Sequence, residues 1–169
     1  MESAGWLERM RSDHRQVIER LEQVAPGTGD ASARPISEIR AFVEFLARQF
    51  DHHMAAEDQV LFPILVDALP AITESLAPLR VEHRELRAML DALAALLQAP
   101  EGGARDQQIQ VQLADLAELL RIHIRKEERL VFQVAERVLR PGELDRLVSD
   151  RTSGSAPRSE PRSPNPRTS

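Results

Sequence analysis

Two distant stretches of the chain each place a histidine four residues before a glutamate. His53 precedes Glu57 in HHMAAEDQVLFP, and His123 precedes Glu127 in HIRKEERLVFQ. Residues so spaced on an α-helix lie one turn apart, with Cβ atoms roughly 5–6 Å from each other. Neutral imidazole nitrogens and carboxylate oxygens are good ligands for divalent first-row metals. Each pair could therefore touch one metal ion, or its glutamate could bridge to a second ion.

Two further histidines lie in similar short motifs. His14 occurs in DHR and His83 in EHR, and these motifs align at an offset of 69 residues. The two histidine–glutamate pairs align at an offset of 70 residues. The pattern predicts a helix pair that occurs twice about a pseudo-twofold axis, with two histidines and one glutamate in each copy.

Helix-breaking residues divide the chain into segments that could position these side chains. Loops are expected at 25–35, 99–106 and 140–142, where proline and glycine gather. Helical patterns are expected at about 4–24, 37–68, 76–98, 106–139 and, for a short fifth helix, 142–150. Candidate N-caps are Ser3, Ser37 and Asp106, and Pro63 should kink the second segment. The arrangement predicts an all-α, up-down-up-down four-helix bundle.

Residues at alternating steps of three and four form one apolar stripe in each long segment, and all four histidines fall on these stripes. The expected core positions are Leu7, Met10, His14, Val17, Leu21 and Val24; Val43, Leu46, Phe50, His53, Glu57, Val60 and Ile64; Leu76, Leu79, His83, Leu86, Leu90, Leu93 and Leu97; Leu116, Leu120, His123, Glu127, Leu130 and Val134. A single histidine on such a face is usually a hydrogen-bonded core residue. Burying four imidazoles and two carboxylates together costs several kcal/mol per unpaired charge, which bound divalent cations would offset.

Polar residues beside these stripes are expected to be less involved. Asp51, His52, Asp58 and Glu128 step off the stripe and are expected in solvent. Glu82 and Glu85 are expected to be surface residues or outer partners of His83 rather than ligands.

Composition excludes several classes of protein. The net charge is −5, and the last 19 residues contribute +3, so the remainder carries −8; an acidic body disfavours nucleic-acid binding. The absence of cysteine excludes disulfides and zinc-thiolate sites. No apolar run approaches the roughly 20 residues that span a bilayer, so no membrane partner is expected and the expected location is cytoplasmic. One domain should cover 1–150, followed by a disordered Pro/Ser/Arg-rich tail at 151–169.

These motifs resemble the hemerythrin-like, HHE cation-binding domain family. The resemblance covers about 5–140 and rests on DHR, EHR, the two HxxxE motifs and the LFP that follows the first of them. It implies a four-helix bundle with a non-haem di-iron centre, oxo- or hydroxo-bridged, in which both glutamates bridge. The implied metal ligands are His14, His53, Glu57, His83, His123 and Glu127, and another divalent metal could replace iron. The implied small-molecule partners are oxygen, nitric oxide or peroxide.

One position departs from oxygen-carrying members of that family, which usually have a second histidine four residues after the first in the third helix. Arg87 stands there, so simple reversible oxygen carriage is less expected than sensing or buffering of oxygen, nitric oxide or iron. The alternative is an enzyme that acts on peroxide or nitric oxide or repairs iron centres. A metal-free bundle that acts through its basic tail is a third reading. Ferritin-like proteins, the nearest structural rival, use a Glu-x-x-His spacing that these core positions lack.

Overall fold

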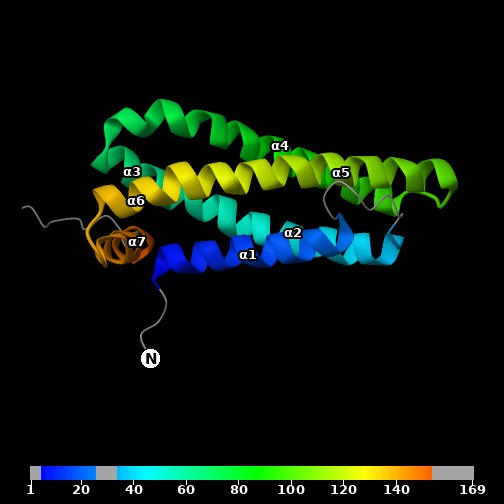
Figure 1. Cartoon of the computed structure of the whole chain (residues 1–169), viewed down its shortest axis with the longest axis horizontal. Coiled ribbons are helices and arrows are strands. Elements are labelled where there is room, and N and C mark those ends of the chain that lie inside the picture. Colours follow the sequence, from blue (N-terminus) through cyan, green and yellow to red (C-terminus); the bar gives the residue numbers. More distant parts are fainter. Residues whose placement is uncertain (1–4, 26–33, 154–169) are drawn as a thin grey trace, which may run out of the picture.

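The computed structural model describes residues 5–25 and 34–153. The expected cap at Ser3, most of the 25–35 loop and the tail beyond 153 therefore lie outside the described residues. Three α-helices run without interruption from one end of the bundle toward the other or continue into a second segment, and a seventh helix follows (Figure 1). The bounds are α1 Trp6–Val24; α2 Ile36–Ala56, η1 Glu57–Leu61 and α3 Phe62–Ala68; η2 Pro70–Ile72 and α4 Thr73–Gln98; α5 Gly103–Lys126, η3 Glu127–Phe132 and α6 Gln133–Val138; α7 Glu143–Ser153.

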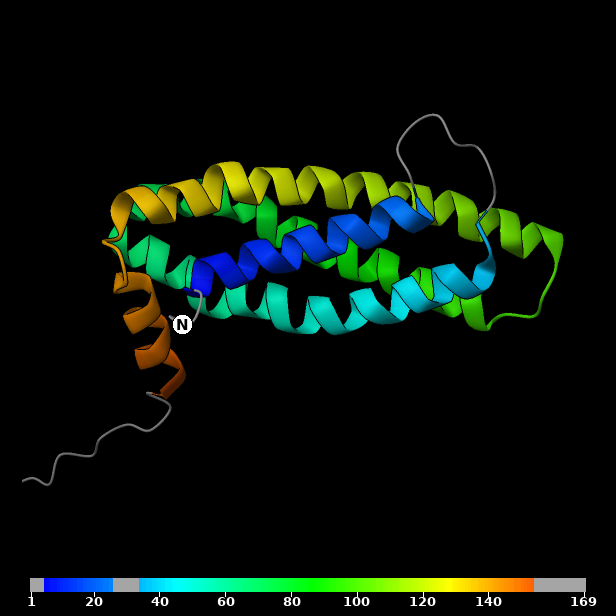
Figure 2. The same cartoon turned by 60° about the horizontal axis from the view of Figure 1, so that its bottom comes forward.

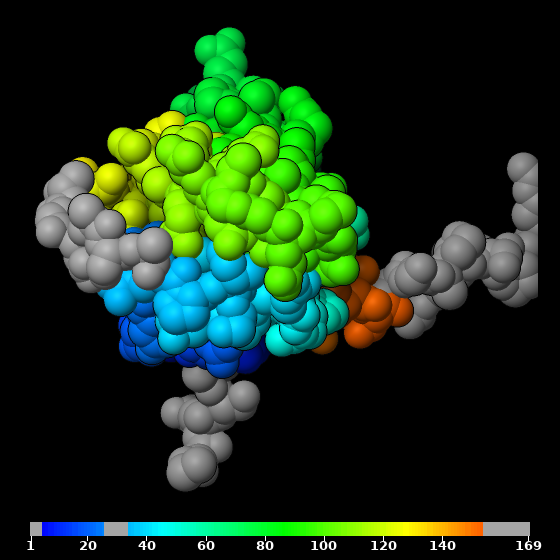
Figure 3. All heavy atoms as spheres, turned by 90° about the vertical axis from the view of Figure 1, so that its right-hand side faces the viewer, coloured from blue at the N-terminus to red at the C-terminus, as the bar shows by residue number. Residues whose placement is uncertain are grey.

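Four long helical rods lie side by side and alternate in direction, which confirms the predicted four-helix bundle (Figures 1 and 2). The rods are α1, the continuous run from α2 through α3, α4, and the continuous run from α5 through α6. The first turns of α2 and the connection between α4 and α5 lie together at one end of the bundle (Figure 3). The bundle therefore brings residues from all four rods to a common interior.

Helix α7 crosses the opposite end of the bundle (Figure 2). Leu144 and Val148 are buried there, and the backbone N–H of Trp6 donates a 2.6 Å hydrogen bond to Asp145 Oδ1. This helix ends at Ser153 rather than at residue 150, because its helical pattern continues three residues into the segment expected as tail.

Several helix starts differ from the sequence-based expectation. Helix α2 begins at Ile36 with Pro35 as its N-cap residue, so Ser37 lies inside the first turn. Helix α5 begins at Gly103, three residues before the expected cap Asp106. Helix α4 begins at Thr73, so Pro78 lies in its second turn. The polar residues expected as caps lie within first turns instead, because glycine and proline tolerate the cap backbone without a side-chain hydrogen bond.

The two rods that carry the histidine–glutamate pairs both contain a π-helical turn that begins at the glutamate. These turns are η1, Glu57–Leu61, and η3, Glu127–Phe132. The kink was expected at Pro63, which instead lies in the first turn of α3, after η1. The equivalent turn η3 is followed by Gln133, so proline is not required for the distortion. Single π turns inside α-helices occur frequently at functional sites.

Each π turn shifts the buried face of its rod by one residue. Beyond η1 the buried residues are Leu61 and Phe62, while Val60, expected in the core, is only partly buried. Beyond η3, Val131 and Ala135 are fully buried in place of the expected Leu130 and Val134. An extra residue in the turn moves every later side chain off the 3.6-residue period.

A buried polar layer divides the apolar core into two clusters. One cluster, which includes Val17, Leu46 and Leu120, lies on the side of the α4–α5 connection. The other includes Met10, Phe62 and Phe132 and extends to α7. The four core histidines and two glutamates lie at the level between the two clusters. None of the helices in the described ranges is both long and apolar enough to cross a membrane.

Candidate metal centre

The structure brings all six residues of the predicted ligand set together. Their donor atoms form two groups, within each of which the atoms lie within 4.8 Å of one another. One group contains His14 and His53, the other contains His83 and His123, and both contain the two glutamates. We refer to the first group as the α1/α2 position and to the second as the α4/α5 position. Their role as metal ligands remains a prediction.

The carboxylate of Glu57 faces both positions at once. Its Oε1 lies 3.4 Å from His53 Nε2, and its Oε2 lies 3.5 Å from His83 Nε2. One oxygen of the same carboxylate is therefore directed toward each group, as a bridging carboxylate requires.

Glu127 repeats this arrangement from the opposite rod. Its Oε2 lies 3.2 Å from His14 Nε2, while its Oε1 lies 3.1 Å from His83 Nε2 and 3.0 Å from His123 Nε2. The two glutamates thus enclose the space between the positions from both sides.

Three of these carboxylate oxygens are buried without a hydrogen-bond donor. Both oxygens of Glu57 and Oε2 of Glu127 lack a hydrogen-bond partner, and both side chains are fully buried. A buried charged oxygen left without a partner costs at least about 1–3 kcal/mol. Imidazole nitrogens that point at these oxygens without hydrogen-bond geometry leave room for a cation between them. The donor set of these six residues fits a pair of divalent metal ions.

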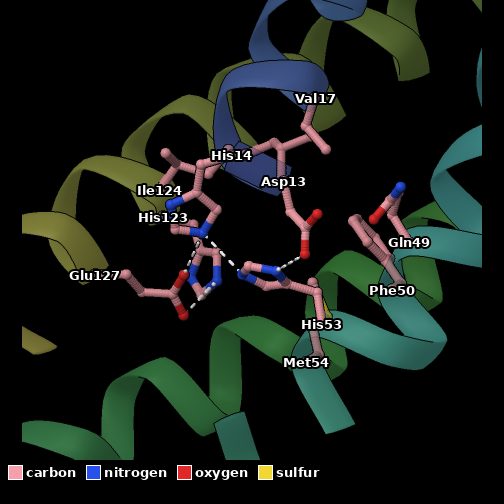
Figure 4. A pocket seen from close by; sticks show the side chains of 11 residues that line it. Asp13, His14, Val17, Gln49, Phe50, His53, Met54, His123, Ile124 and Glu127 are labelled. Carbon is pink, nitrogen blue, oxygen red and sulfur yellow. Dashed lines mark hydrogen bonds and ion pairs between the residues drawn. The ribbon is translucent and has the colours of Figure 1, made fainter. Parts of the chain in front are cut away.

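The imidazole rings present one nitrogen inward. His14 Nε2 and His53 Nε2 lie 2.9 Å apart, and Figure 4 shows both rings and Glu127 directed toward a common point. Stacking fixes the planes of two rings: Phe132 stacks on His14 at 5.1 Å between centroids, and Phe62 stacks on His83 at 5.8 Å.

The outer nitrogen of each ring in the α1/α2 position faces a further carboxylate. His53 Nδ1 lies 3.3 Å from Asp13 Oδ2, and His14 Nδ1 lies 3.3 Å from Glu128 Oε1. The contact between Asp13 and His53 is visible in Figure 4. An imidazole whose outer N–H is held by a carboxylate presents its inner nitrogen as an unprotonated, more basic metal donor.

The α4/α5 position repeats the same pattern. His123 Nδ1 lies 3.0 Å from Glu82 Oε2, and His83 Nδ1 lies 3.1 Å from Asp58 Oδ2. Asp13 and Glu82 are related by the 69-residue offset, and Asp58 and Glu128 by the 70-residue offset. The internal repeat of the sequence thus extends to four outer carboxylates.

These outer contacts correct part of the sequence-based expectation. Asp58 and Glu128 were expected in solvent, but both contact an imidazole, because the π turn that begins at the preceding glutamate turns them toward the bundle. Glu82 is buried and is the outer partner of His123, whereas Glu85 is exposed as expected. The sequence signal that could have identified them is the repeat itself, which keeps an acid beside each core ligand.

The buried charges shift one another's pKa values. Burial lowers the pKa of His53, but Glu57 and Asp13 outweigh it and raise this pKa to about 10. At His83, burial is likewise outweighed, by Asp58 and the two glutamates, and the pKa rises to about 11. Burial would raise the pKa of Glu127, yet His123 and its neighbours hold this pKa well below the ordinary value. Without metal, the histidines therefore carry protons, which a metal ion has to displace.

Arg87, the residue that departs from oxygen carriers, does not belong to either group. Its Nη2 donates a 3.2 Å hydrogen bond to the backbone carbonyl of Phe50 in α2. The guanidinium therefore ties α4 to α2 one turn away from His83, and each position has two histidines.

Comparison with known proteins agrees with this geometry. The profile of the hemerythrin HHE cation-binding domain matches residues 7–135, which include all six residues of the two groups. None of the curated proteins compared with the chain matches it. The match covers more than half of the chain, and the buried histidines and glutamates form groups that can bind metal. The chain belongs to the hemerythrin HHE cation-binding domain family.

Proposed function

We propose that the protein is a non-haem di-iron protein that binds or senses oxygen, nitric oxide or iron. The observation that carries this proposal is the pair of buried glutamates, each with one oxygen directed toward either pair of histidines. Two divalent ions would neutralise both carboxylates and use all six side chains. Iron held by this donor set would supply reversible redox chemistry and affinity for diatomic ligands.

The histidines leave room for a ligand. Two imidazoles and two shared carboxylates give four donors at each position, fewer than the six of octahedral coordination. Open coordination positions of this kind characterise non-haem iron sites that react with oxygen. The outer carboxylates hold the four rings in orientation, and the two apolar clusters keep bulk water away from the site.

A small cavity opens beside the α1/α2 position. It is lined by His14, His53 and His123 together with apolar side chains that include Val17 and Phe50 (Figure 4). The volume open to the centre of a water-sized molecule is about 20 Å³, above the roughly 10–15 Å³ that a single water needs. An apolar cavity of this size suits one diatomic molecule.

Metal analysis of protein purified without oxygen tests the proposal most directly. We expect about two iron ions per chain and an absorbance change when oxygen or nitric oxide is added. Repeated cycles of binding and release would favour the binding or sensing role. Multiple turnovers with peroxide or nitric oxide would favour the enzymatic alternative, which the open coordination also permits. Zinc alone, or no metal, would overturn the di-iron proposal.

Val17 offers a test of the cavity itself. At the equivalent position of the other half, the residue is Leu86, which is larger by one methylene. Val17→Leu should fill the cavity, and overpacking of about 1–3 kcal/mol corresponds to roughly tenfold weaker ligand binding. The measurement is a titration of the iron-loaded variant with nitric oxide, followed by absorbance.

Leu86→Val is the matched control, because it changes the same methylene on the other side of the site. We expect this control to keep the wild-type affinity for nitric oxide, and both variants to keep their metal content. Equal affinities for Val17→Leu and the wild type would show that the ligand does not enter this cavity.

A further inference from the structure

The two halves of the site differ in the cations that lie behind the outer carboxylates. Lys126 Nζ contacts Glu82 Oε1, and Arg80 Nη1 lies 3.8 Å from Asp58 Oδ1. Both contacts belong to the α4/α5 position. Across the described ranges, no lysine or arginine forms a hydrogen bond or ion pair with Asp13 or with Glu128, the outer carboxylates of the α1/α2 position.

The repeat shows where this difference arises in the sequence. The 70-residue offset relates Lys126 to Ala56, which carries no charge. The 69-residue offset relates Arg80 to Arg11, so both halves keep an arginine. Arg11 is held elsewhere, because its Nη2 lies 2.7 Å from Glu136 Oε1, and the equivalent of Glu136 is the apolar Val66. One half has thus lost its lysine and diverted its arginine.

A cation behind an outer carboxylate weakens the metal position in front of it. The carboxylate makes the inner imidazole nitrogen a stronger donor by holding the outer N–H. Lys126 withdraws negative charge from Glu82, and hence from His123, and its positive charge also repels a bound divalent cation. The chain of contacts runs from Lys126 through Glu82 and His123 to the α4/α5 position.

Solvent acts in the opposite direction but less strongly. The side chains of Asp13 and Glu128 are 35% and 44% exposed, against 11% for Glu82, so water screens the first two more. Water is neutral and reorients when a cation binds, whereas the ammonium of Lys126 keeps a full charge in direct contact with Glu82. The net effect favours the α1/α2 position for a divalent cation.

We propose that Lys126, assisted by Arg80, makes the two metal positions unequal, so that the α1/α2 position fills first and the α4/α5 position second, with lower affinity. This inference rests on the metal pair of the proposed function. It assigns the stronger donor set to the position beside the cavity, where a diatomic ligand would bind. Lys126 is a positioning residue of the charge field, since it contacts Glu82 and not the metal ligands' inner atoms.

Calorimetric titration of the metal-free full-length chain with Fe²⁺, without oxygen, tests the inference. The wild type should bind in two resolved steps. Lys126→Ala should tighten the weaker step by up to about tenfold, less than the 10–100-fold effect of losing an outer partner itself, and leave the tighter step unchanged. Ala56→Lys places the charge in the other half and should weaken the tighter step.

Arg125→Ala serves as the control, because Arg125 is an exposed cation next to Lys126 whose Nε donates to the backbone carbonyl of Arg121 and not to an outer carboxylate. It should leave both steps unchanged. Two equal steps in the wild type, or a Lys126→Ala variant with unchanged steps, would overturn the inference and leave the metal pair standing. Absence of Fe²⁺ binding in the wild type would instead overturn the proposed function, and the inference with it.

Discussion

Removal of bound metal is expected to lower the melting temperature of the protein by roughly 15–30 °C. A metal that binds only the folded state contributes about 4 kcal/mol when its free concentration is about a thousand times its Kd, so two such ions contribute about 8 kcal/mol. For a chain of this size, each kcal/mol shifts the melting temperature by about 2–4 °C. The large effect follows because the six ligands come from all four rods of the bundle.

The measurement is thermal unfolding followed by circular dichroism, before and after treatment with a chelator. The metal-free protein should remain helical at low temperature, because the two apolar clusters and the ion pairs of the polar layer persist without metal. Addition of Fe²⁺ without oxygen should restore the higher melting temperature. An unchanged melting temperature after verified metal removal would contradict a metal role in joining the rods.

Replacement of Glu57 by glutamine is expected to reduce bound metal from two ions per chain to one or fewer. Both oxygens of Glu57 face histidine nitrogens without a hydrogen-bond partner, so this carboxylate has no structural function that an amide would lose. The amide has nearly the same shape but is neutral and offers only one acceptor oxygen. One substitution therefore removes a ligand from both positions, and we expect at least about 100-fold weaker binding of the second ion.

Metal content after dialysis against Fe²⁺ without oxygen measures this effect. Glu57→Gln should also melt close to the chelated wild type, because it forfeits the stabilisation that metal provides. Glu85→Gln is the matched control: this glutamate is exposed and lies next to the same site, and its loss should change neither property. A Glu57→Gln variant that retains two ions would show that Glu57 does not bridge.

Individual residues show how far the sequence could predict the site. His53 and Glu57 were predicted to share a face because a spacing of four residues is close to one helical turn, and this holds whatever the helix packs against. His14 and His83 were predicted to join them because their motifs recur at the offset of the two pairs. The bundle followed from the same periodicity, since four apolar stripes joined by short connections have few ways to bury one another.

The sequence was less informative where the helices depart from regular geometry. Periodicity places Val60 and Leu130 in the core, but the π turns bury Leu61 and Val131 instead. These turns let each rod direct a glutamate into the polar layer and still present large apolar residues to the second cluster. No local pattern signals them, because the competing demands come from the neighbouring rods.

The sequence alone therefore determined the four-helix bundle, the internal repeat and the six residues of the polar layer, because helical periodicity is a local property of the chain. Only the tertiary structure decided the outer contacts of Asp58 and Glu128 and the unequal placement of Lys126 and Arg11. Those contacts join residues on different rods, and a rotation of one residue along a rod makes or breaks them. Their physical origin is the packing of the rods against one another.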